Sequence, residues 1–222
     1  MADNDTPNRV QVVWNMIGGD SIVDQLIAGT KRLVVVESVL EGAALDSALH
    51  AAARVDKNTT HLRYLSSTTL APTKGSVTIA QSADVFPGFL DPNFEGWDTN
   101  VAGVDTAEMS ADIYEMKKKD GTYAQLFGSL TGAQGSYEEV VAACHPLCWQ
   151  QGQIVEFARS HRALLRQDGY ATLFLFKVDG EVFVAYVRVG GGGLLADVYR
   201  FSDTFVWRAD HRHRVVVPQQ TV

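Results

Sequence analysis

Two apolar stretches on either side of Asp179-Gly180 form the clearest pattern in the chain. Residues 169–189 are rich in β-branched and aromatic side chains, which favour strands. Asp-Gly is a preferred two-residue hairpin turn, because glycine readily adopts the positive φ that the turn requires. This turn would place Phe176 opposite Phe183. Both faces of the predicted hairpin are apolar, so we expect it at the centre of an antiparallel sheet that is covered on both sides.

Helical spacing of apolar residues predicts helices elsewhere, within residues 7–55, at 106–118 and at 153–167. The last is the clearest, because six residues share one helical face: Ile154, Phe157, Ala158, His161, Leu164 and Leu165. Shorter β-type stretches predict strands at 62–65, 76–79, 194–201, 204–208 and 213–217.

These elements predict an α+β protein with N-terminal helices, a loop-rich middle and a C-terminal antiparallel sheet with a helix packed on it. At 222 residues the chain is long enough for one domain with a large core, and we expect a single domain over residues 1–222. The alternative is a subdivision into a helical segment, 1–56, and a sheet-containing body, 57–222.

Charge and hydropathy narrow the choice of partners and location. The net charge of −7 argues against nucleic acid, since binding phosphates requires a surplus of Lys and Arg on some face. No apolar run approaches the roughly 20 residues of a membrane helix, so no membrane partner is expected. The first residues lack a signal-peptide pattern. We therefore expect a protein inside the cell, or one that forms part of an assembled particle.

The two cysteines and one histidine partly match a zinc motif. Cys144, Cys148 and His161 have the spacing of the first three ligands of a two-Cys, two-His site. The fourth ligand is missing, because Leu, Arg and Gln occupy residues 165–167. We interpret the cysteines as buried thiols and His161 as part of a core-facing helix. No metal and no other cofactor is expected.

The same residues are the candidates for catalysis. A cysteine nucleophile, Cys144 or Cys148, would need His161, His211 or His213 as its base, brought close by folding. No pattern indicates an oxyanion hole. A hydrolase or transferase is therefore an alternative, and the prediction leans toward a protein that is not an enzyme.

A long irregular segment, residues 81–106, interleaves aromatic and acidic side chains. Its candidate interaction residues are Phe86, Phe89, Asp91, Phe94, Trp97 and Asp98. Irregular segments of this length in a compact domain are usually functional. Three uses are open: stacking on a carbohydrate-type ligand, insertion into a neighbouring subunit, or packing against the segment's own domain.

Two basic stretches interrupt this acidic chain. Residues 117–119 are all lysine, and we interpret them as the charged end of the predicted helix at 106–118. In His211-Arg212-His213-Arg214, strand alternation would place the histidines on one face and the arginines on the other. This cluster is either an exposed strand face or a pH-sensitive or carboxylate-binding contact.

The leading functional hypothesis is a non-enzymatic structural or interaction protein, and specifically a self-associating subunit of a homomeric particle, tube or shell. No catalytic motif is complete. The aromatic segment and an apolar sheet that needs cover on both faces are features that a neighbouring subunit would satisfy.

Overall fold

A computed structural model describes residues 57–117 and 119–219 of the chain. The helices predicted within residues 7–55 lie outside the described residues. The choice between one domain and a boundary near residue 56 also stays a prediction. The unit that begins at Asn58 is compact by itself, and it has a mixed α+β fold.

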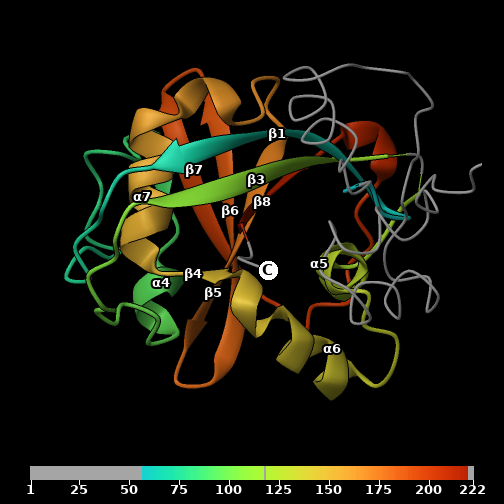
Figure 1. The fold of residues 1–222 in the computed structure, drawn as a ribbon. Helices are drawn as coiled ribbons and strands as arrows, with labels where there is room; N and C mark the ends of the chain where they lie inside the picture. The colour runs from blue at the N-terminus through green and yellow to red at the C-terminus, as the bar shows by residue number, and fades with distance from the viewer. Residues whose placement is uncertain (1–56, 118, 220–222) are drawn as a thin grey trace, which may run out of the picture. The chain divides into compact units, whose positions relative to one another are not determined.

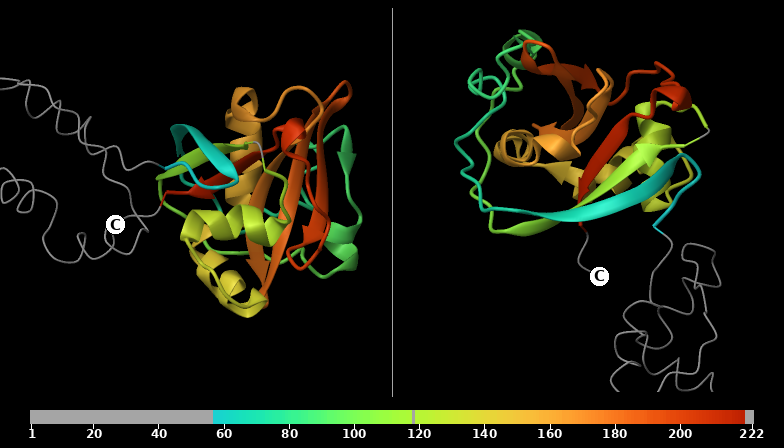
Figure 2. Two further views of the ribbon diagram at one scale, coloured as in Figure 1. Left: turned by 90° about the vertical axis from the view of Figure 1, so that its right-hand side faces the viewer. Right: turned by 90° about the horizontal axis from the view of Figure 1, so that it is seen from above.

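A mixed sheet of eight strands forms the body of this unit (Figure 1). Neighbouring strands follow the order β1-β3-β8-β5-β6-β7-β2, and the short strand β4 pairs with β5. The sheet is strongly twisted (Figure 2). Its strands are β1 (Leu62–Leu70), β2 (Phe89–Leu90), β3 (Met109–Met116), β4 (Cys148–Trp149), β5 (Ala171–Val178), β6 (Glu181–Gly190), β7 (Gly193–Arg200) and β8 (Arg214–Pro218).

The hairpin of β5 and β6 has the predicted register, with Phe176 opposite Phe183. Asp179 and Gly180 both have positive φ, 49° and 89°, as a type I′ turn requires. The hairpin lies inside the sheet between β8 and β7. Its central position is therefore confirmed.

The expectation of a purely antiparallel sheet is wrong. β8 runs parallel to β5, with Thr172 paired with Arg214, although it is antiparallel to β3. The chain leaves β7 at Arg200 and returns at β8 through an irregular segment, residues 201–213. A connection of this length allows the crossover that parallel strands need.

Helices from the same chain cover both faces of the sheet. On one face, α4 (Asn93–Gly96) and α7 (Gln151–Ser160) pack over a core that contains Phe174 and Phe176. On the other, α5 (Tyr123–Thr131) and α6 (Tyr137–Cys144) pack over Leu173 and Leu175 (Figure 1). The apolar hairpin therefore needs no neighbouring subunit as cover, and this argument for assembly no longer holds.

The helix predicted at 106–118 is wrong, because most of that segment forms β3. Met109, Ile113 and Met116 do have helical spacing, but β3 lies between β1 and β8 and is buried on both faces. Its polar residues find partners on β1 and in the segment before β5. Asp112 accepts a 2.6 Å hydrogen bond from Ser67, and Glu115 pairs with Arg63 and Arg166. Tertiary contacts thus override local propensity.

Two predicted strands do not form, and one predicted helix ends earlier. Residues 76–79 are irregular instead of a strand, and 204–208 contributes one isolated bridge, between Trp207 and Gly121. The helix predicted at 153–167 ends at Ser160 and is followed by a 3₁₀ turn, η2 (Arg162–Leu164). Strands β7 and β8 confirm those predicted at 194–201 and 213–217 within one residue.

Candidate functional site

The structure separates the cysteines from His161. Cys144, the last residue of α6, is fully buried in the core on that face of the sheet, whereas His161 packs its ring against Phe157 in the core on the opposite face. The His161 ring nitrogen lies 3.0 Å from the carbonyl oxygen of Thr69. No group of three His, Cys, Asp or Glu residues in the described part of the chain is arranged to hold a metal ion.

Burial also suppresses the reactivity of the thiols. It raises the pKa of Cys144 to about 12 and that of Cys148 to about 11. The Cys148 sulfur is 3.7 Å from the Cys144 carbonyl oxygen, in a weak hydrogen bond. Since the thiolate is the nucleophile, neither cysteine is prepared for catalysis.

The aromatic residues of segment 81–106 are placed differently from one another. Phe86 and Phe94 are buried, and Phe94 stacks on Phe176. Trp97 packs on Phe183 beneath the guanidinium of Arg200, which lies 5.1 Å from the indole ring. Phe89 remains 44% exposed. Two of the four rings are therefore unavailable to a ligand.

The acidic residues of this segment divide in the same way. Asp91 is structural, because its two carboxylate oxygens accept hydrogen bonds from the amides of Asn93 and Val198. Glu95 and Asp98 are exposed and pair with no basic side chain in the part of the chain that the structure describes. Asp98 has a positive φ of 56°.

His211 and His213 lie within a cluster of aromatic rings. Their ring centroids are 5.6 Å apart, and His211 stacks on Tyr170 at 4.5 Å. His213 is buried against Trp207, and its Nδ1 atom accepts a hydrogen bond from the amide of Ala171. Burial lowers the pKa of His213 to about 4, with a further lowering from nearby His211. His213 is therefore neutral at neutral pH.

The two basic stretches meet at a cleft of about 760 Å³, which lies between the start of β1, the end of β3 and the 3₁₀ turn η3 (Ala209–His211). Its size falls within the usual range for ligand pockets. We call it the cationic cleft. Its basic residues are Arg63, Lys117, Lys119, Arg208 and Arg212, and its acidic residues are Glu115, Asp120 and Asp210.

The carboxylates of the cationic cleft are already bound. Glu115 is held by Arg63 and Arg166, and Asp210 by Arg208 at 2.6 Å. The carboxylate of Asp120 accepts a 2.8 Å hydrogen bond from the amide of Ala209. The cleft therefore does not neutralise all of its own basic side chains.

Lys119 and Arg212 are the two uncommitted cations of the cleft. Both are exposed, and neither side chain has an acidic partner among residues 57–117 and 119–219. Arg212 holds the left-handed conformation, with φ 49° and ψ 44°. A residue with a Cβ atom costs energy there, and such strained residues cluster at functional sites.

The sequence shows both basic stretches but does not indicate that they lie close together in the fold. The link is the pairing of β3 with β8, which places Glu115 opposite Arg214 and so joins the residues after 116 to those before 214. The helix that the sequence predicts at 106–118 is incompatible with this strand pairing, so the cleft was not predicted. Residues 211–214 do not form one exposed strand face, because β8 begins only at Arg214 and His211 belongs to η3.

Comparison with protein families, with curated proteins and with solved structures finds no match to this chain. The class is therefore defined by the structure alone, as a mixed α+β unit with an open cationic cleft at one end of β1 and β3. Among the described residues, no helix is long and apolar enough to cross a membrane.

Proposed function

We propose that this chain is a non-enzymatic interaction protein that binds a carboxylate-rich segment of a partner protein in the cationic cleft. The observation that supports this most is the local charge. The cleft combines five basic with three acidic residues, a surplus of two positive charges (5 − 3) in a chain whose net charge is −7. Lys119 and Arg212 are the side chains available to such a segment.

A protein carboxylate suits the cleft better than nucleic acid does. A nucleic acid is a polyanion, so it would be repelled by the three carboxylates of the cleft and by the net negative charge of the chain. A short acidic segment carries fewer charges and can place them beside Lys119 and Arg212 alone. Arginine also binds carboxylates in a two-point geometry that gives specificity.

The position of the thiols supports the non-enzymatic part of the proposal. An acid or base partner for Cys144 or Cys148 would have to reach a thiol whose pKa burial has raised. His161 lies in the opposite core. A location inside the cell or within an assembled particle stays part of the same proposal.

A labelled glutamate-rich peptide tests the binding. We expect it to bind the full chain at low ionic strength, measured by fluorescence anisotropy. The variant Lys119→Glu with Arg212→Asn should weaken binding about tenfold, or roughly 1.4 kcal/mol. Asparagine is chosen at 212 because it tolerates positive φ.

A matched control separates the cleft from overall charge. Arg162→Asn with Lys177→Glu changes the net charge by the same amount at exposed positions outside the cleft. The control should bind the peptide as the unmodified chain does. Equal losses in both variants would contradict the proposal, and so would tighter binding of a single-stranded oligonucleotide than of the peptide.

A further inference from the structure

Segment 81–106 is a concentrated source of negative charge. It contains five acidic residues and no lysine, arginine or histidine; the five are Asp84, Asp91, Glu95, Asp98 and Asp105. Asp84 pairs with Arg159 and Asp105 with Lys74, while Asp91 binds backbone amides. Glu95 and Asp98 are thus the carboxylates of this segment that are left available in the described structure.

These two carboxylates stand on a rigid support. Glu95 belongs to the short helix α4, whose Phe94 side chain is completely buried. Asp98 follows Trp97, which is packed on Phe183. Anchored charges lose little conformational freedom on binding, which favours association. Phe89, 44% exposed, adds an apolar contact on the same segment.

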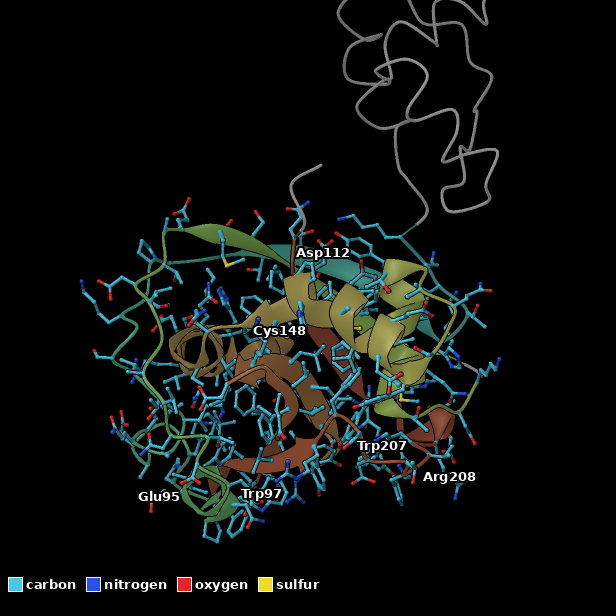
Figure 3. The ribbon with its side chains drawn as sticks, turned by 90° about the horizontal axis from the view of Figure 1, so that it is seen from below. Glu95, Trp97, Asp112, Cys148, Trp207 and Arg208 are labelled. Carbon is cyan, nitrogen blue, oxygen red and sulfur yellow. The ribbon has the colours of Figure 1, made fainter. Side chains whose placement is uncertain are left out.

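The acidic residues and the cationic cleft lie on different sides of the unit. Figure 3 places Glu95 at one side and Arg208, a residue of the cleft, at the other. The cleft therefore cannot take up Glu95 and Asp98 of its own chain without dismantling the packing of Phe94 and Trp97. Those carboxylates can reach only the cleft of another molecule.

We infer that the acidic partner is a second copy of this chain, whose Glu95 and Asp98 enter the cationic cleft beside Lys119 and Arg212. This inference rests on the proposed function, because it names the segment that the cleft binds. The two surfaces differ, so the contact is head-to-tail and extends into a ring or a filament. The repulsion between two chains of charge −7 is screened beyond about 8 Å at physiological ionic strength, whereas direct contacts are much less so.

Sedimentation velocity of the full chain over a range of concentrations tests this. The unmodified chain should associate with increasing concentration. The cleft variant, Lys119→Glu with Arg212→Asn, and the loop variant, Glu95→Lys with Asp98→Asn, should each weaken association at least about tenfold. The control Arg162→Asn with Lys177→Glu should associate normally.

Mixing the cleft variant with the loop variant tests the contact more sharply than either variant alone. Together, the cleft variant and the loop variant retain one intact cleft and one intact acidic segment between them, so they should associate when mixed although neither does so alone. A chain that carries all four substitutions reverses one of the two charge pairs and neutralises the other, so it should regain part of the association. A mixture that stays monomeric would overturn the inference.

The peptide experiment distinguishes the two proposals. If the glutamate-rich peptide binds the cleft while the chain remains monomeric at every concentration, the inference fails and the proposed function stands. If neither the peptide nor a second copy binds, both fail. Association that the loop variant leaves unchanged would also overturn the inference, because it would use another surface.

Discussion

Arg166 donates a 3.0 Å hydrogen bond from Nη1 to Oε1 of Glu115, a carboxylate whose side chain is only 5% exposed. Arg63 binds the other oxygen of Glu115 from a more exposed position. The pair of Arg166 and Glu115 joins β3 to the segment before β5, and Glu115 and Arg63 line the cationic cleft.

Removing the carboxylate should destabilise the fold strongly. Glu115→Ala leaves the mostly buried guanidinium of Arg166 with Asp168 as its remaining acidic partner. We expect a loss of roughly 3 kcal/mol in the free energy of unfolding, measured with urea. Arg63→Ala is the control and should cost less than about 1 kcal/mol, because the Arg63 side chain is half exposed and Arg166 still binds Glu115. Equal losses would contradict this assignment.

The second prediction concerns the contribution of the hairpin turn to stability. A Cβ atom at Gly180 would meet no atom within 4 Å, so Gly180→Ala tests the positive φ alone. The substitution should lower the free energy of unfolding by about 1–2 kcal/mol. Gly191 also has open space around it but no positive φ, and Gly191→Ala should change stability by less than about 0.5 kcal/mol. A neutral Gly180→Ala would mean that this turn does not require the left-handed conformation.

The sequence predicts what is local. The register of β5 and β6 follows from one dipeptide and from the alternation of residues beside it, and the structure has that register. Periodicity likewise indicates α7, although its end at Ser160 depends on how the next residues pack.

What the sequence misses depends on contacts between distant segments. The spacing of Met109, Ile113 and Met116 fits a helix, and the partners that make it a strand lie about 50 residues away or more, in β1 and in Arg166. The cationic cleft was missed for the same reason. Its basic residues come from three segments, and strand order in the sheet, which local pattern does not determine, brings them together.

His213 should make stability depend on pH. Its pKa is about 4 in the folded protein and about 6.5 in an unfolded chain, so the folded state favours the neutral ring. This contribution is present above pH 6.5 and is lost as the pH falls toward 4, by roughly 3 kcal/mol in total. The charges of His211 and Arg166 lower this pKa further, whereas the charge of Asp168 raises it.

Urea unfolding at several pH values measures this effect. In His213→Gln, whose side-chain oxygen can still accept the Ala171 amide, the loss of stability between pH 6.5 and 4 should be smaller than in the unmodified chain. His61, whose pKa burial also lowers, contributes equally to both proteins. Identical pH profiles would show that His213 is not the group that titrates.

The last prediction concerns the reactivity of the two thiols, which distinguishes an interaction protein from a cysteine enzyme. With a pKa of about 11, Cys148 is about 0.1% thiolate at pH 8, whereas a free cysteine of pKa 8.5 is roughly one quarter thiolate. Alkylation by iodoacetamide should therefore be on the order of a hundredfold slower in the folded chain than in urea. Cys144 is fully buried and should react more slowly still. Cys148→Ser, which leaves Cys144 alone, identifies the reacting thiol. Rapid alkylation of one cysteine in the folded chain would instead favour the hydrolase or transferase alternative, because only a stabilised thiolate reacts in that way.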